Sequence, residues 1–290
     1  MKAYHNIVDL ILREGKPKND RTGIGTIDVI GVKFEHDMST GFPLLTTKKM
    51  PFRLVATELE FFIKGYTDKK WLQERENHIW DEWANPKKAP YGHDEASKQK
   101  MHEERDLGPV YGFQWRHFGA EYINYDTDYS GKGIDQLKNV VDTLKKDPAS
   151  RRIIVSSWNP KDIPSMALPP CHYTFQVDAL DGKLNLMWNQ RSIDTMLGLP
   201  FNIASYGLLL HLLAKESGLK EGKLVGFLGD THIYKNHIDQ AKELLKRDPI
   251  KYKLPTIEVE PFETIFNWQA ENTKVKDYKC YPAIKMNIAV

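Results

Sequence analysis

The feature that most constrains the fold is a predicted β-hairpin at residues 173–189, with chemically active side chains at both ends. Two extended segments are separated there by Asp181-Gly182. An Asp-Gly pair between such segments is a strong hairpin signal. Because a hairpin brings its two ends together, Cys171 before the first strand and Arg191 after the second are expected to face one pocket.

These side chains suit covalent chemistry on an anionic substrate. A thiol such as that of Cys171 becomes a soft nucleophile when nearby cations lower its pKa. Arg191 and Ser192 together suit a phosphate, which a guanidinium binds with two parallel bonds. The residues alone leave two alternatives open: a thiol that attacks a nucleotide base, or a Cys-His hydrolase using His172 or His232.

Composition narrows the classes of protein to consider. The chain has 41 basic and 39 acidic residues, which gives no support for a nucleic-acid or membrane surface. It has no apolar run of transmembrane length, and Asp9 interrupts the apolar stretch that a signal peptide would need. Two cysteines make no disulfide framework, so we expect a reducing, cytoplasmic setting.

Four further features have both a structural and a chemical interpretation. Glu58, in a predicted helix at 54–62, is either exposed or buried with a raised pKa that suits proton transfer. Trp80 is a core anchor or a stacking platform for a flat ligand. Tyr111 is packed or functional, and the adjacent Arg151-Arg152 are surface charges or a phosphate bridge.

The second half of the chain carries a possible nucleoside site. The Asn202 amide offers both a donor and an acceptor, which suits an edge such as that of uracil. His232 and Tyr234 alternate on a predicted strand, share a face, and could hold a sugar hydroxyl. The spacing of His232 and His237 does not match a zinc motif, so no metal is expected.

Apolar periodicity predicts the other elements. Helices are expected at 2–14, 134–146, 203–216 and 236–246. Strands are expected at 26–34, 153–158, 223–234, 254–260 and 281–288. The polar stretch at about 84–105 is expected to be a surface insertion, because dense aromatic sequence resumes directly after it.

Taken together, the motifs resemble the thymidylate synthase family over nearly the whole chain, and so many in order are very specific. They are DRTGIGT (20–26), FPLLTTKK (42–49), ELEFFIKG (58–65), IWDEW (79–83), DLGPVYGFQWRHFGAEY (106–122), DYSGKGIDQL (128–137), SRRIIVSSWNP (150–160), MALPPCH (166–172), QRSIDTMLGLPFNIASY (190–206), GDTHIYKNH (229–237) and YPAIKMNIAV (281–290).

The resemblance implies one catalytic domain over residues 1–290 with an α+β fold. A twisted mixed β-sheet would carry helices packed on one face, and two subunits would pack sheet to sheet as a homodimer. The implied reaction is reductive methylation of dUMP at C5 with 5,10-methylenetetrahydrofolate, giving dTMP and dihydrofolate. No membrane or nucleic acid would be required.

The resemblance also implies roles for individual residues. The catalytic set would be Cys171 as nucleophile at C6 of dUMP, Glu58 as proton relay, Tyr111 at the C5 proton, and Arg191, which would depress the Cys171 pKa. The nucleotide would be bound by Arg21, Arg191, Ser192, Asp194, Asn202, His232 and Tyr234, with Arg151 and Arg152 given to the partner's site. The folate would meet Ile79, Trp80, Asp194, Gly198 and Ala289, while Ala289 and Val290 would close over the site and exclude water.

The chain departs from the usual family pattern at Asp68, Trp188, Asn189, Met196 and Tyr281. Asn189 bears on the product, because the related pyrimidine nucleotide hydroxymethylases use the same cysteine chemistry and let water quench the methylene. That activity is the alternative, and Trp80 with the terminal Ala-Val favours methylation. A second alternative is an inactive nucleotide- or RNA-binding relative.

Overall fold

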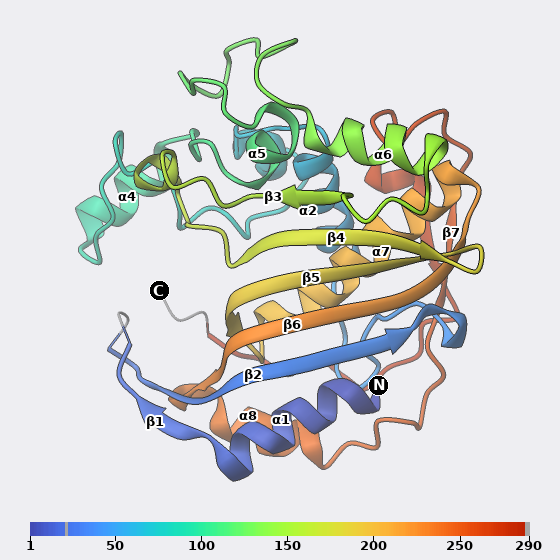
Figure 1. The fold of residues 1–290 in the computed structure, drawn as a ribbon. Coiled ribbons are helices and arrows are strands. Elements are labelled where there is room, and N and C mark those ends of the chain that lie inside the picture. Colours follow the sequence, from blue (N-terminus) through green and yellow to red (C-terminus); the bar gives the residue numbers. More distant parts are fainter. Residues whose placement is uncertain (21–22, 288–290) are drawn as a thin grey trace.

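The computed structural model describes residues 1–20 and 23–287 as an α+β fold built on one twisted sheet (Figure 1). The strand order is β1-β2-β6-β5-β4-β3. Only β5 and β6 pair in parallel among these strands, so the sheet is mixed, as predicted. The strands are β1 (Lys16–Lys18), β2 (Thr26–Asp37), β3 (Ile154–Ser156), β4 (His172–Leu180), β5 (Lys183–Asp194) and β6 (Lys220–Tyr234).

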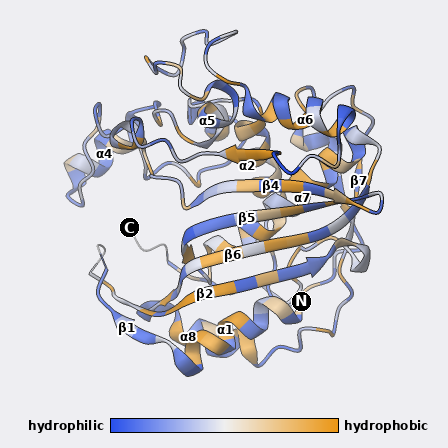
Figure 2. Cartoon of the chain, in the orientation of Figure 1, coloured by the Kyte–Doolittle hydropathy of each residue, from blue (hydrophilic) through white to orange (hydrophobic). Residues whose placement is uncertain are grey.

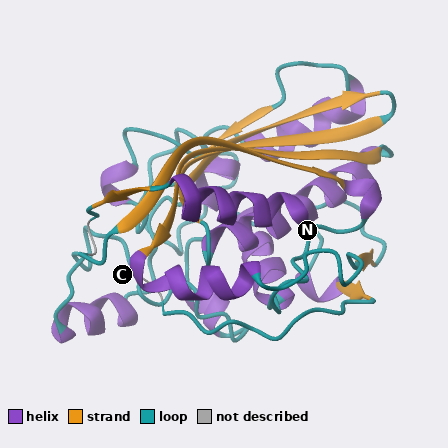
Figure 3. Cartoon of the chain, turned by 90° about the horizontal axis from the view of Figure 1, so that it is seen from below, coloured by secondary structure: helices purple, strands orange, loops and turns teal. Residues whose placement is uncertain are grey.

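The helices lie on one side of the sheet, which also agrees with the prediction (Figure 3). The longest, α7, is apolar on nearly all sides and packs against β5 and β6, where alternate side chains such as Trp188 and Gln190 are buried. The α-helices are α1 (Lys2–Glu14), α2 (Phe52–Ile63), α3 (Lys70–Gln73), α4 (Glu95–Glu103), α5 (Tyr111–His117), α6 (Gln136–Lys146), α7 (Gly198–Ser217) and α8 (Ile238–Leu245).

The other face of the sheet exposes large apolar side chains. Figure 2 shows long hydrophobic stretches on β2 and β6. Ile30, Ile154 and Phe227 are 76%, 52% and 45% exposed. The strand neighbours of Ile154 and Phe227 are buried, and Ile30 follows the half-buried Val29, so these three side chains are directed away from the helices. An apolar sheet face of this kind marks a surface suited to association.

The predicted hairpin is present as β4 and β5. Asp181 and Gly182 have φ angles of 52° and 72°, so both turn residues are left-handed. This is the geometry of a type I′ turn, which favours Gly and Asp and matches the twist of the flanking strands.

Two sequence predictions need correction. Helix α7 begins at Gly198, earlier than the predicted 203, because Pro200 lies in the first turn, where its missing N–H has no helical acceptor to lose. The strand predicted at 281–288 is wrong for the described residues 281–287, which form no strand. Instead β7 (Thr256–Val259) pairs with β8 (Thr273–Lys276) in a separate two-stranded sheet.

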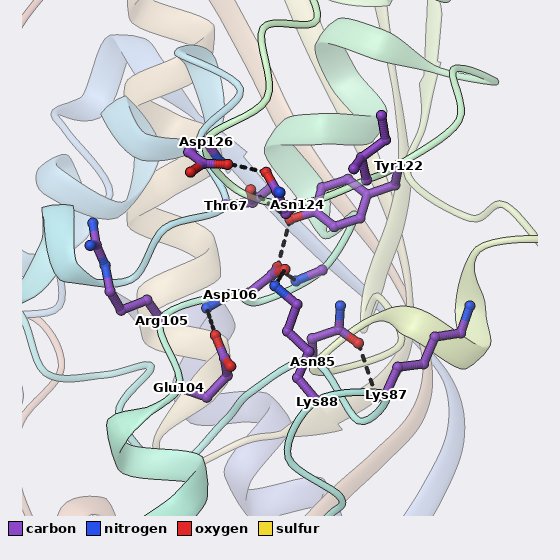
Figure 4. A network of polar contacts seen from close by, with 12 residues as sticks. Thr67, Asn85, Lys87, Lys88, Glu104, Arg105, Asp106, Tyr122, Asn124 and Asp126 are labelled. Atoms are coloured by element: carbon purple, nitrogen blue, oxygen red, sulfur yellow. Dashed lines mark hydrogen bonds and ion pairs between the residues drawn. The ribbon is translucent and has the colours of Figure 1, made fainter.

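The polar stretch at 84–105 contains α4 and is tied to the rest of the chain through buried polar groups. The fully buried Asp106 accepts a hydrogen bond from the Tyr122 hydroxyl at 2.6 Å and forms an ion pair with Lys88 at 2.6 Å (Figure 4). The buried Lys69 ammonium donates to the carbonyls of Trp83 and Met101. These contacts fix the stretch against the loop that carries Trp80 and Trp83. No helix in the described part of the chain is long and apolar enough to cross a membrane.

Candidate active site

The hairpin places Arg191 beside Cys171, as the sequence led us to expect. The Arg191 backbone N–H donates to the Cys171 carbonyl at 2.8 Å. Its guanidinium donates from Nε to the Pro170 carbonyl at 3.0 Å and from Nη2 to the Pro169 carbonyl at 2.8 Å. The Arg191 side chain therefore holds the turn that carries the thiol, and its other N–H groups remain for an anion.

Burial, rather than charge, decides the pKa of the Cys171 thiol. Burial raises this pKa above its ordinary value, Arg191 lowers it by a smaller amount, and Asp194 raises it. Arg191 therefore depresses the Cys171 pKa as expected, and burial outweighs its contribution. The thiol is half-buried, and desolvation disfavours the thiolate more than one guanidinium stabilises it.

Tyr111 contacts the nucleophile's backbone directly. Its hydroxyl accepts a hydrogen bond from the Cys171 N–H at 2.8 Å. Burial raises the Tyr111 pKa well above its ordinary value, so the phenol stays protonated and can donate its own proton to a ligand. Tyr111 begins α5, and this first-turn position directs its ring towards the start of β4.

His172 is held as a neutral packing group. Its ring stacks on Tyr111 with centroids 4.2 Å apart, and its Nδ1 lies 2.9 Å from the Tyr206 hydroxyl. Burial lowers the His172 pKa to about 3. A base of this strength takes up a proton poorly at neutral pH, which disfavours the Cys-His hydrolase that uses His172.

Glu58 and Glu60 both lie inside the protein but point in different directions from α2. Glu58 Oε1 accepts a hydrogen bond from Trp80 Nε1 at 2.8 Å, and burial raises its pKa to about 7. Glu60 instead accepts from the Ala270 N–H at 2.9 Å. Trp80 is 5% exposed and lies 6.2 Å from the Tyr111 ring, so it joins the core at the edge of the site.

Glu58→Gln is expected to make the protein more stable at high pH. The Glu58 pKa is raised from 4.5 to about 7 in the folded state. Between these values the folded protein retains a proton that the unfolded chain has lost, so stability falls as the pH rises through this window. Glutamine keeps the acceptor for Trp80 and cannot ionise.

The check is urea unfolding of both proteins at pH 5 and pH 8. The stability advantage of the glutamine variant should grow by roughly 2–3 kcal/mol between these two pH values. A difference that is the same at both values would contradict the raised pKa.

A buried chain of amides lies beside the hairpin. Asn202 on α7 accepts a hydrogen bond at Oδ1 from Gln190 Nε2 at 3.0 Å. Gln190 is 3% exposed and also contacts Trp188 Nε1 at 3.1 Å. Ser192 is half-buried, follows Arg191 on β5 and pairs with Asp230 on β6.

His232 is oriented by a charged group. Its Nδ1 lies 2.8 Å from Asp230 Oδ1, and Lys18 pairs with both Asp230 and Asp28. The possible ligand atoms of Asp28, Asp230 and His232 lie within 4.8 Å of one another. The Lys18 ammonium forms ion pairs with both carboxylates of this group and so offsets their negative charge. The Tyr234 ring is 5.2 Å from that of His232, so the two side chains meet as predicted.

Asp194 ends β5 and accepts at Oδ1 from the N–H groups of Met196 and Leu197, at 3.0 and 3.1 Å. Its second oxygen can accept a bond from a ligand. Gly198 lies within van der Waals range of Asp194 and Asn202, since a Cβ there would be 3.7 Å and 3.9 Å from their side chains. Ile79 is half-buried next to Trp80.

The structure also places Lys48 here, which the sequence reasoning missed. Lys48 is 5% exposed, its ammonium donates to the Met196 carbonyl, and burial lowers its pKa to about 8 while Asp194 opposes that change. The available signal is a lysine among the polar residues that close the short apolar run of 42–49. An ammonium has three donors, so those of Lys48 that do not bind the Met196 carbonyl can donate to a ligand.

Some predicted site residues are not brought to Cys171. Ile154 pairs with Gln176, so the exposed Arg151 and Arg152 lie towards the turn of the hairpin, whereas Cys171 precedes the other end of β4. At about 3.3 Å per residue this separation is roughly 20 Å. Arg21, Ala289 and Val290 lie outside the described residues.

Comparison with known proteins supports the family resemblance that the sequence motifs indicate. The family model described as thymidylate synthase matches residues 2–290. A bifunctional dihydrofolate reductase-thymidylate synthase of Paramecium tetraurelia is 44% identical over 287 residues. That alignment covers 99% of this chain and 61% of the relative, so the chain spans less than two thirds of that protein's length.

Proposed function

Because the chain belongs to the thymidylate synthase family, we propose that it methylates dUMP at C5 with 5,10-methylenetetrahydrofolate and produces dTMP and dihydrofolate. The observation that carries the proposal is the arrangement around Cys171. A thiol, a guanidinium clamp and a protonated phenol meet at the start of β4. This arrangement suits addition of a thiol to a base whose phosphate is held nearby.

The first step is covalent. Cys171 Sγ forms a bond to C6 of the uracil, and the electron pair of the C5–C6 double bond moves to C5, which becomes the nucleophile that the one-carbon unit requires. When bound, the folate supplies both the one-carbon unit and the hydride. The phenol of Tyr111 lies next to Cys171, stays protonated, and donates a hydrogen bond to the ordered water that takes up the C5 proton. The thiolate then leaves C6 and the double bond is restored.

Glu58 acts as the proton relay of the site. Its pKa of about 7 allows it both to release and to accept a proton near neutral pH. The hydrogen bond from Trp80 fixes one carboxylate oxygen and leaves the other for ordered water or a ligand.

The remaining side chains bind the two substrates. Arg191 and Ser192 hold the phosphate with Arg21, Asn202 reads the uracil edge, and His232 and Tyr234 bind the ribose. On the folate side, the second oxygen of Asp194 fits a ring N–H, and Lys48 fits an anionic group. Ile79, Trp80 and Gly198 line this part, with Ala289 closing over it.

The active unit is a homodimer in which the open faces of two sheets pack together. The exposed Ile30, Ile154 and Phe227 on that face support this arrangement. Each subunit gives Arg151 and Arg152 to its partner's phosphate site, which accounts for their exposure and their distance from Cys171 in their own chain. Cys171 and Cys280 are both unpaired, which fits a reducing, cytoplasmic setting.

One assay separates this function from the alternatives. The protein is incubated with dUMP and methylenetetrahydrofolate, and the products are resolved. We expect dTMP with dihydrofolate, and a rise in absorbance as dihydrofolate forms. Formation of 5-hydroxymethyl-dUMP with tetrahydrofolate would instead identify a hydroxymethylase, and no turnover would identify an inactive relative. We expect that Asn189 does not change the product from dTMP. Its side chain lies on the open sheet face, because Asn189 alternates along β5 with the buried Trp188 and Gln190.

A further inference from the structure

We propose that Trp188 fixes the orientation of the Asn202 amide and thereby sets the preference for uracil over cytosine. The inference rests on the proposed function, and within it on the base-reading role of Asn202. Trp188 is fully buried on β5, two residues before Gln190. Within the described residues its hydrogen-bond path to Asn202 runs through Gln190, so it acts as a positioning residue.

Three side chains form a hydrogen-bond chain with one direction. Trp188 Nε1 donates to Gln190 Oε1 at 3.1 Å. Gln190 Nε2 then donates to Asn202 Oδ1 at 3.0 Å and to the Ser192 carbonyl at 3.1 Å. Because Gln190 is 3% exposed, water has little access to replace these bonds.

The groups at the two ends of this hydrogen-bond chain cannot exchange donor and acceptor roles, whereas the amides between them could. An indole N–H only donates and a backbone carbonyl only accepts, but an amide has nearly the same shape when turned over. If Gln190 turned over, its NH₂ would face the Trp188 N–H and its oxygen would face the Ser192 carbonyl. Both contacts would be buried mismatches, so Gln190 keeps its direction and imposes it on Asn202.

The direction of Asn202 decides which base edge fits. Asn202 is held with Oδ1 as the acceptor and Nδ2 as the free donor. Uracil offers a donor at N3 and an acceptor at O4, which matches this orientation. Cytosine offers an acceptor at N3 and an amine donor at C4, which would require the amide to turn over. Trp188 therefore opposes cytosine through a group that never touches the base.

The indole itself is held in a closely fitting site. It stacks on Tyr206 with centroids 5.3 Å apart and an interplanar angle of 12°. The indole lies over Gly226 of the neighbouring strand β6, and a Cβ added at Gly226 would come within 2.5 Å of the ring. Alanine at position 226 must therefore displace the ring, which gives a second way to break the bond to Gln190.

The test compares nucleotide affinity in Trp188→Phe with that in Trp268→Phe. Phenylalanine at 188 keeps a ring to stack on Tyr206 and removes the N–H. Trp268 is the matched control, because it is 1% exposed and donates from Nε1 to Thr273 Oγ1 at 3.0 Å, and among the described residues it has no hydrogen bond to the amide chain. Dissociation constants for dUMP and dCMP are measured by calorimetry.

We expect the ratio of the dCMP to the dUMP constant to fall about tenfold in Trp188→Phe, the effect of one lost buried hydrogen bond, and to stay unchanged in Trp268→Phe. Asn202→Asp, which should admit dCMP directly, gives the upper limit of the change. If Trp188→Phe does not fold, Gly226→Ala is measured instead and should lower the ratio in the same direction.

An unchanged ratio in Trp188→Phe, with dUMP and dCMP weakened equally, would overturn the inference and leave Trp188 as a core residue. Failure of the proposed function looks different. In that case the unmodified protein would bind dUMP no better than dCMP, or would not convert dUMP when methylenetetrahydrofolate is present.

Discussion

Cys171→Ser is expected to lower kcat for dTMP formation by about 10⁴-fold or more. The hydroxyl of serine is far less nucleophilic than a thiol, and the arrangement of Tyr111 and Arg191 around position 171 contains no base strong enough to activate it. Initial rates with dUMP and methylenetetrahydrofolate measure the effect. Binding of dUMP should survive, because the backbone contacts of residue 171 are retained.

Cys280→Ser is the matched control for this experiment. Cys280 is the second unpaired cysteine and lies in the segment after β8, where it neighbours Tyr278. Its substitution should leave the rate within about twofold of the unmodified enzyme. Full turnover by Cys171→Ser would show that position 171 does not supply the nucleophile.

Arg191→Gln is expected to reduce kcat/KM for dUMP by roughly 10³-fold, since removal of a paired charge at a binding site costs about 2–5 kcal/mol. Two effects add here. The phosphate loses its fork of donors, and the turn at Pro169 and Pro170 loses the guanidinium that holds it. Arg191 also lowers the Cys171 pKa, so the variant's thiol should become less reactive.

Two measurements check the Arg191 prediction. Steady-state kinetics give kcat/KM, and the rate of iodoacetamide alkylation at pH 8 reports the thiolate of Cys171. Arg13→Gln is the control, because Arg13 pairs only with Asp9 and Glu14 on the surface of α1 among the described residues. Alkylation at an unchanged rate, together with an unchanged KM, would refute both roles of Arg191.

The elements that local sequence encodes could be predicted. The hairpin follows from Asp181-Gly182, whose conformation the residue types dictate. The sequence predicts the last strand at the wrong place, because the apolar residues of 281–287 pack without strand pairing, while β8 at Thr273–Lys276 has a lysine-rich sequence with little strand signal. Its pairing with β7 is a tertiary contact that local propensity does not reveal.

In the candidate site, too, contacts within one local element could be predicted and contacts between distant elements could not. The proximity of Cys171 and Arg191 follows from the register of one hairpin. The bonds from Tyr111 to Cys171 and from Gln190 to Asn202 join elements whose relative placement depends on the whole core. The Cys171 pKa could not be predicted either, because burial outweighs the nearby charge and burial is a property of the fold.

Mass spectrometry of the protein with 5-fluoro-dUMP and methylenetetrahydrofolate tests the central claim most directly. Fluorine at C5 cannot leave as a proton would, so the reaction should stop with the nucleotide still bonded to the cysteine. We expect an intact mass raised by one nucleotide and one folate per subunit, with the modification on the peptide that contains Cys171. An unmodified mass, or an adduct on Cys280, would contradict covalent catalysis by Cys171.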